Sequence, residues 1–242
     1  MGLDIYVGPF TRYLTGDWKT VMAQAAEAEG IEFTTIRLDD TAPEDAPDTD
    51  EVVEMVHSWQ SAMTEALGVE KAWDDNPDAP YATDQPHWLG YGALLILAAR
   101  LERPQLASDT DDPADFQASA AFQASQQDGS AMFPSLLGGA QWWLPLAGLS
   151  ATFTGSGFQG EMVPMSTLDL LENELDTLSK GLGVPGSALA EALLLGGPGV
   201  DGPPTPEQAP EYLTAWGVFG LAVFRELTHQ AQRMQLPLLL DA

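Results

Sequence analysis

Apolar residues recur at helical spacing in three long segments of the chain, and each segment predicts a helix. In segment 50–67 they fall on one face of a helix that Asp50 would cap. Segment 88–101 is mostly apolar and stops before Pro104, which predicts a buried helix. Segment 207–234 predicts a long helix that is buried on most sides, because its apolar residues surround it. Its main apolar stripe consists of Tyr212, Trp216, Phe219, Val223 and Leu227.

Shorter runs rich in apolar or β-branched residues predict strands. The chain opens with a β-α-β pattern, in which strands at 3–7 and 31–36 flank a helix at 17–29 that Asp17 would cap. The remaining predicted strands are 142–146, 151–154, 161–165 and a final edge strand at 237–240.

Three further helices complete the pattern, at 109–129, 166–180 and 187–195, the second with a capping-box-like start at Ser166 and Asp169. Prolines and charge in segment 73–84 predict no regular structure there. The elements together predict a single domain over residues 1–242. Its fold class is α/β, with α+β as an alternative: a small mixed sheet, about five to seven helices and a long buried C-terminal helix.

The charge balance narrows the range of partners. The chain holds 36 acidic and 9 basic residues, for a formal net charge of −27. A basic surface for nucleic acid or for an anionic membrane is therefore not expected. The longest apolar stretches, 91–99 and 215–224, are about half of the ~20 residues that a membrane-spanning helix needs. The chain does not open with a secretory signal pattern, so we expect a cytoplasmic protein.

Carboxylates concentrate in the segment 38–54, which contains no basic residue. It reads as an exposed acidic loop followed by the start of a helix. The candidate binding residues of this segment are Asp39, Asp40, Glu44, Asp45, Asp48, Asp50 and Glu51. Three interpretations stay open: a solvated surface of a salt-adapted protein, a surface that binds a basic protein, or a cation site. The cation site lacks an EF-hand spacing, and we expect no metal and no cofactor.

Several reaction classes lack their sequence signatures. The chain has no cysteine, which excludes disulfides, cysteine nucleophiles and cysteine-ligated metals. No phosphate-binding glycine loop, no G-x-S-x-G nucleophile motif and no H-E-x-x-H metal motif occurs. Of the three histidines, His57 and His229 lie on predicted helices, where His229 near a helix C-terminus has a structural explanation. His87, with Asp84 in the same loop, is the candidate acid–base pair. In the structural alternative Asp84 caps the helix that follows.

The N-terminal region is dense in chemistry-bearing residues. The possible pocket consists of Asp4, Tyr6, Arg12, Tyr13, Asp17 and Trp18. Arg12 is expected to pair with Asp4 or Asp17, and such a pair either lines a pocket or pins the loop. Adjacent Trp142 and Trp143 point to opposite faces if the segment is a strand. One of them is therefore either an exposed interface anchor or part of a core that covers both sheet faces.

The opening Met-Gly-Leu-Asp-Ile-Tyr-Val-Gly resembles that of a group of bacterial proteins whose function is unassigned. Other residues that carry the likeness are Thr11–Tyr13, Gly16–Trp18, Tyr81, Asp84, Gly90–Ala93 and Pro237–Asp241. The resemblance implies no activity and no site.

Two classes of function remain, with salt adaptation as a third explanation of the charge. The favoured one is a non-enzymatic acidic binding protein of the immunity or inhibitor type, which docks a basic toxin or nucleic-acid enzyme. The alternative is an enzyme of unfamiliar type, with a pocket built from the N-terminal block and the loop at 81–88. Carboxylates spread evenly over the surface, together with a deep cleft lined by polar side chains, would favour the enzyme.

Overall fold

The computed structural model describes residues 3–31, 48–70, 72–108, 111–199, 205 and 207–241. Its centre is a six-stranded mixed sheet in the order β2-β1-β6-β3-β5-β4. Neighbouring strands are antiparallel except for β3 and β5, which are parallel. The strands are β1 (Asp4–Val7), β2 (Ala82–Asp84), β3 (Trp142–Leu144), β4 (Thr152–Ser156), β5 (Met162–Thr167) and β6 (Leu238–Asp241).

The described residues contain eight α-helices around this sheet, so the predicted α/β class is confirmed. They are α1 (Phe10–Thr15), α2 (Val21–Ala28), α3 (Thr49–Leu67), α4 (Trp88–Glu102), α5 (Ala120–Asp128), α6 (Leu168–Gly181), α7 (Gly186–Leu195) and α8 (Ala209–Met234). Short 3₁₀ helices occupy Pro104–Leu106 and Pro113–Ala118. Among the described residues, no helix combines the length and the hydropathy needed to cross a membrane.

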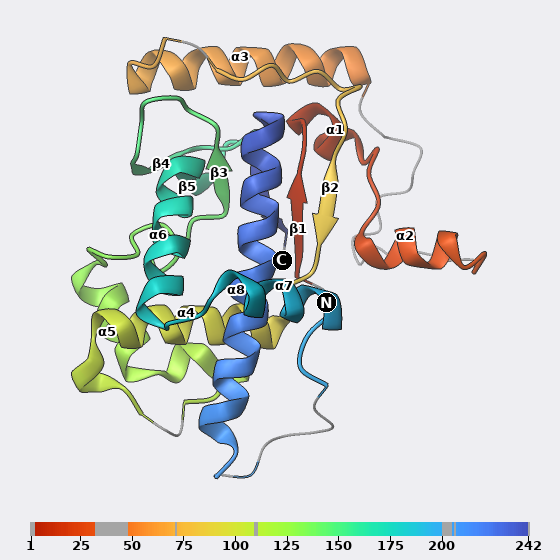
Figure 1. Ribbon diagram of the computed structural model, residues 1–242. Coiled ribbons are helices and arrows are strands. Elements are labelled where there is room, and N and C mark those ends of the chain that lie inside the picture. Colours follow the sequence, from red (N-terminus) through yellow and green to blue (C-terminus); the bar gives the residue numbers. More distant parts are fainter. Residues whose placement is uncertain are drawn as a thin grey trace.

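Two hydrophobic clusters cover the two faces of the sheet. On one face, Ile5, Val7 and Trp143 pack with apolar residues of α4, α6 and α8. On the other face, Tyr6 and Leu239 pack with Phe10 of α1, residues of α3 and several aromatic rings. Helix α3 crosses one end of the sheet, and α2 projects away from it (Figure 1). All residues of β1 are buried, as expected of a strand covered on both faces.

Helices α4 and α8 pack closely because glycines line their crossing. A Cβ atom at Gly220 would overlap the carbonyl oxygen of Gly90, and one at Gly217 would overlap Leu97. The small residues therefore allow the two backbones to approach each other. Helix α8 is buried over most of its described length, which confirms the predicted long C-terminal helix.

Three predictions of secondary structure were wrong. Segment 237–240 was expected at an edge, but β6 lies between β1 and β3, because an apolar strand gains most when both of its faces are buried. Segment 73–84 ends in strand β2, since β1 offers it an antiparallel partner. One helix was expected between the first strand and residue 31, whereas the structure has two: α2 is a shorter form of the helix predicted at 17–29, and α1, which was not predicted, ends at Gly16, which has a φ of 71°.

Helix starts also differ from their predicted caps, each by a few residues. Thr20 caps α2 in place of Asp17, and Asp48 caps α3 in place of Asp50. Thr167 caps α6 in place of Ser166. In each case a neighbouring hydroxyl or carboxylate reaches the free N–H groups of the first turn. The strand predicted at 31–36 falls almost entirely outside the described residues.

Candidate ligand-binding pocket

A pocket of about 650 Å³ lies where β1 begins and β6 ends. Its volume falls in the range typical of sites for small organic molecules. Helices α1, α4 and α5, the 3₁₀ helix at 113–118 and the segment before β3 complete its walls. The side chains that carry its chemistry are Tyr13, Trp88, Tyr91, Phe116, Gln117, Phe122, Gln126, Gln141, Trp142 and Asp241.

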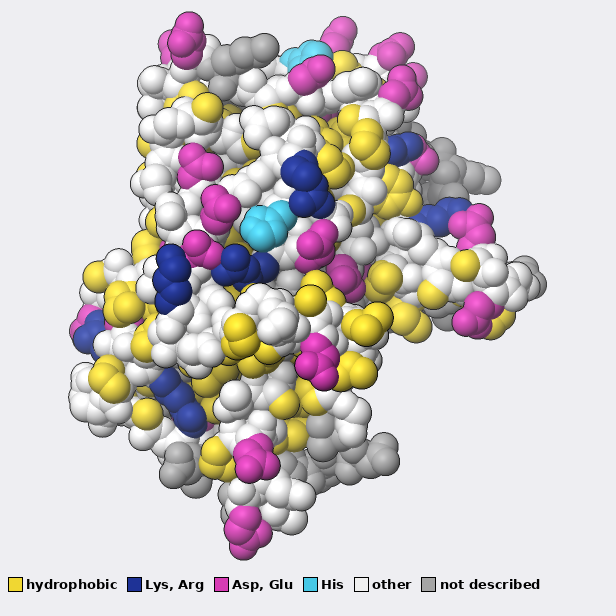
Figure 2. Space-filling view, viewed as in Figure 1, with side chains coloured by type: hydrophobic (Ala, Val, Ile, Leu, Met, Phe, Trp, Pro, Cys, Tyr) yellow, Lys and Arg dark blue, Asp and Glu magenta, His cyan; other side chains and the backbone are white. Residues whose placement is uncertain are grey.

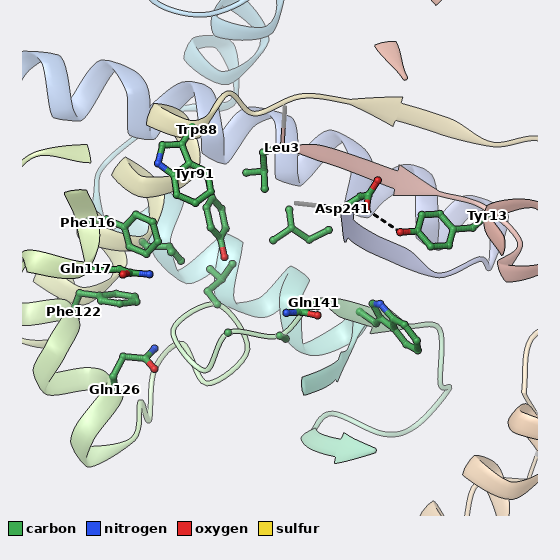
Figure 3. Close-up of a pocket in the computed structure, with 16 residues that line it drawn as sticks. Leu3, Tyr13, Trp88, Tyr91, Phe116, Gln117, Phe122, Gln126, Gln141 and Asp241 are labelled. Atoms are coloured by element: carbon green, nitrogen blue, oxygen red, sulfur yellow. Dashed lines mark hydrogen bonds between the residues drawn. The ribbon is translucent and has the colours of Figure 1, made fainter. Parts of the chain in front are cut away.

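Aromatic rings form one side of this pocket. Trp88, Tyr91 and Phe116 lie with ring centroids 5.7–6.2 Å apart, and Phe122 stands edge-on to Phe116. Figure 3 shows these rings on one side of the space and Tyr13 with Asp241 on the opposite side. The rings stand at 50° or more to one another, so their edges and faces both border the space.

Several hydrogen-bonding groups of the pocket have no protein partner among the described residues. The Tyr91 hydroxyl and the side-chain amides of Gln117 and Gln141 are of this kind. Burial raises the pKa of Tyr91 to about 12, so its hydroxyl keeps its proton at neutral pH and can donate a hydrogen bond. These groups can donate to or accept from a bound molecule without breaking a bond within the protein.

The opposite side of the pocket carries Asp241, the one charged residue among the described residues that line it. The Tyr13 hydroxyl donates to Asp241 Oδ1 at 2.9 Å, and burial together with this carboxylate raises the pKa of Tyr13. Asp4 lies directly across from Asp241 in the β1–β6 pair. The side-chain amide of Gln85 donates to Asp4 at 2.8 Å. Burial raises the pKa of Asp4, and the negative charge of Asp241 adds to this effect.

A buried glutamate holds the segment that contains Ser135 and Leu136, which forms part of the pocket wall. Glu174 of α6 accepts hydrogen bonds from the backbone N–H groups of Ser135 and Leu136, at 2.7 and 2.9 Å. It also accepts one from the Ser135 hydroxyl, at 2.8 Å. Leu136 lines the pocket, so Glu174 fixes the position of this wall.

The predicted N-terminal pocket residues separate into different surroundings. Of the six, Tyr13 lines the pocket, whereas Tyr6 is buried and its hydroxyl donates to the Pro9 carbonyl at 3.0 Å. Arg12 pairs with Asp17 at 2.8 Å, as one of the two predicted partners, and also donates to the Ala79 carbonyl. Its guanidinium lies 5.1 Å from the centre of the Tyr81 ring. This is the arrangement that pins the loop.

Trp18 packs against the rings of Tyr6 and Tyr13, so it also has a structural role. Asp4 lies opposite Asp241 in the β1–β6 pair, whereas Arg12 pairs with Asp17. Both tryptophans of β3 pack in the core, on opposite faces of the sheet. Trp143 is 1% exposed, and Trp142 packs against Phe10 on the other face. The double-faced core is therefore confirmed, and neither tryptophan is an exposed anchor.

His87 and Asp84 line a different pocket, of about 270 Å³, together with Gln85 and Trp216. His87 itself caps α4, because its Nδ1 accepts from the backbone N–H of Leu89 at 3.2 Å. Asp84 therefore does not cap this helix; its carboxylate accepts from the backbone N–H of Gln85. The His87 ring stacks on Trp216 with centroids 4.7 Å apart. The structure records no hydrogen bond between His87 and Asp84.

The acidic candidates divide between described and undescribed residues. Asp39, Asp40, Glu44 and Asp45 lie outside the described residues. Asp48, Asp50 and Glu51 are exposed at the start of α3, where negative charge favours the helix dipole. On the face shown in Figure 2, carboxylates are spread over the molecule in small groups rather than gathered in one patch.

Sequence reasoning missed most of the pocket. Tyr91 carries the one available signal, a hydroxyl near the start of a mostly apolar helix. Gln117, Gln126 and Gln141 have no motif, and Asp241 joins Tyr13 only because β6 pairs with β1. Within the described residues, no group of three or more His, Asp or Glu side chains is placed to hold a metal ion. Comparisons with models of protein families, with curated proteins and with solved structures find no match.

Proposed function

We propose that this protein binds a small organic molecule in the pocket between α4, α5 and the ends of β1 and β6. The observation that carries the proposal is the combination of aromatic walls with unpartnered hydrogen-bonding groups on Tyr91, Gln117 and Gln141. Specific sites for small molecules likewise combine aromatic and apolar walls with a few oriented polar groups. The spread of carboxylates in Figure 2 and the polar groups of the pocket are features that would favour an enzyme. We nevertheless favour binding over catalysis, because the candidate acid–base pair, His87 and Asp84, lines a different pocket.

The charges of the pocket define the class of ligand. Asp241 is the charged residue among the described lining residues, Asp4 lies opposite it in the β1–β6 pair, and no described lining residue is basic. An anionic ligand would meet the Asp241 carboxylate and the field of a chain with a net charge of −27. The ligand is therefore neutral or positively charged, with a ring that packs against Trp88 and Tyr91.

Three probes that share one ring test this proposal: indole, tryptamine and indole-3-acetate, which are neutral, positive and negative at neutral pH. Isothermal titration calorimetry should detect tryptamine and indole, and indole-3-acetate should bind at least about tenfold more weakly. Asp241→Asn should weaken the binding of tryptamine and leave the affinity for indole unchanged. Tyr91→Phe removes a hydroxyl without a protein partner, so it should lower affinity and not stability.

The proposal fails if no probe binds, or if the three bind equally. It also fails if Tyr91→Phe and Asp241→Asn leave every affinity unchanged, because the probes would then occupy another place. Tyr212 is half-buried on α8 and does not line this pocket. Tyr212→Phe therefore removes a hydroxyl elsewhere and serves as the matched control.

We further propose that the acidic surface binds a basic protein, as an inhibitor or immunity protein would. The supporting observation is that Asp48, Asp50, Glu51 and Glu54 are exposed at the start of α3 and form no ion pair with a described residue. A pull-down from lysate at low and at high salt tests this. A basic partner that elutes with salt supports the proposal, and no partner at either salt contradicts it.

A further inference from the structure

Strand β4 is one edge of the sheet, and the outward backbone groups of Thr154 have no partner among the described residues. Among the described strands it pairs with β5 alone, in an antiparallel register that places Thr154 opposite Pro164. The Pro164 carbonyl accepts from the backbone N–H of Gln141, on the side of β3. Pro164 therefore directs its backbone groups away from β4, and Thr154 belongs to a pair without hydrogen bonds. The N–H and C=O of Thr154 consequently point away from β5, toward the free edge.

An apolar groove runs beside this edge, between β4 and the second half of α3. It has a volume of about 260 Å³ and is lined mainly by Trp59, Met63, Leu67 and Phe153. The indole N–H of Trp59 donates to the Ser156 carbonyl at 2.7 Å, which closes one end of the edge. Met162, opposite Ser156 in β5, is 67% exposed. Backbone groups and apolar side chains thus lie next to each other on one accessible surface.

The charges around the groove determine what can occupy it. Helix α3 and the segment 150–169 contain no lysine and no arginine, and Glu54, Glu65 and Glu161 are exposed there. A second copy of this chain would bring another net charge of −27 and would be repelled. A positively charged segment would be attracted to the same surface.

We propose that the free edge of β4 and the adjoining groove bind an extended, basic segment of a partner protein by strand addition. The segment forms backbone hydrogen bonds with Thr154, and alternate apolar side chains enter the groove beside Met63. The basic side chains between them face the acids of α3 and Glu161. This inference rests on the proposal of a basic partner and names the surface and the backbone conformation that it uses.

Fluorescence anisotropy with a labelled peptide of alternating arginine and valine tests the inference. An alternating glutamate–valine peptide tests the charge, and an arginine–valine peptide with N-methylated backbone tests the strand pairing. The arginine–valine peptide should bind, and each of the other two should bind at least about tenfold more weakly, because one loses charge attraction and the other loses several backbone donors.

Variants locate the site. Thr154→Pro removes the outward N–H but no hydrogen bond to β5, and should weaken the peptide at least about fivefold. Met63→Lys places a positive charge in the groove and should weaken peptide binding by a similar factor. Met22→Lys, on the exposed surface of α2, adds the same charge away from the groove and should leave binding within about twofold. Hydrogen exchange should show the Thr154 amide protected only when peptide is bound.

Three results would overturn the inference. The first is no binding of the arginine–valine peptide. The second is that the N-methylated peptide binds as tightly as the unmethylated one, or that the Thr154→Pro protein binds the peptide as tightly as the wild type. Either result would still allow a basic partner but would exclude strand addition. The third is a dimer of the free protein that Thr154→Pro dissolves, since a second copy would then occupy the edge. Failure of the pull-down alone, with the peptide results intact, would contradict the cellular partner rather than the surface.

Discussion

Glu174 offers a direct test of how the ionisation of a buried carboxyl group affects the stability of this protein. Its side chain is 2% exposed and accepts three hydrogen bonds from Ser135 and Leu136. Burial raises its pKa from 4.5 to about 7, against the opposing effect of these three donors. Between these two pH values the folded protein keeps a proton that the unfolded chain has released.

The sign of the effect follows from this difference in bound protons. Because the folded state binds more protons, the free energy of unfolding falls as the pH rises from 4.5 toward 7. The difference in pKa between the unfolded and folded states corresponds to a change of about 3 kcal/mol in the free energy of unfolding, at about 1.4 kcal/mol per pKa unit. The contribution of Glu174 is thus most favourable below pH 4.5 and is lost once the pH exceeds about 7.

Glu174→Gln isolates this contribution from that of the other acids. Glutamine has the same shape, but its NH₂ group faces a backbone N–H, so the variant should be less stable by about 1–2 kcal/mol near pH 5. Near pH 8 it should equal or exceed the wild type in stability, because it carries no buried charge. Urea unfolding followed by tryptophan fluorescence, at fixed salt, measures both proteins.

Glu191→Gln, at an exposed position of α7, is the matched control and should follow the wild type at every pH. A difference between wild type and Glu174→Gln that stays constant from about pH 5 to about pH 8 would refute the reasoning. It would show that the three donors hold the carboxylate ionised throughout this range.

The remaining predictions concern packing and capping. Asp75, which is buried, accepts the first backbone N–H groups of α1 at 2.7 and 2.9 Å, so Asp75→Ala should lower the free energy of unfolding by about 2–4 kcal/mol in urea titrations. Gly220→Ala should separate α4 from α8 and cost about 2–3 kcal/mol. Gly186→Ala, with open space around it, should change stability by less than about 1 kcal/mol. Equal midpoints for the two alanine variants would contradict the close crossing.

The sequence was informative where one face of an element decides its structure. The apolar stripe of α8 and the periodicity of α3 place both helices within two residues of their observed starts, because periodic burial is a local signal. Strand order is not local. The position of β6 depends on which strands can cover both sides of Leu238–Asp241, and no spacing within four residues records that choice.

The candidate pocket was less accessible to sequence reasoning for the same physical reason. Tyr13 and Asp241 are 228 positions apart and meet only through the pairing of β1 with β6. His87 and Asp84 are three residues apart, yet the Nδ1 of His87 accepts from the backbone N–H of Leu89 and no hydrogen bond joins the two side chains. Proximity in the chain therefore indicated a pair that lies outside this pocket, whereas glutamines without a motif form much of its wall.

The insertion of β6 has a consequence for biosynthesis. Strands β2 and β1 form one part of the sheet, β3, β5 and β4 form the other, and β6 joins them. During translation the two parts wait for residues 238–241, which emerge from the ribosome after all other strands. Nascent chains halted before this point should expose unpaired strand edges and depend on chaperones, and release of the last strand should complete the sheet in one late step.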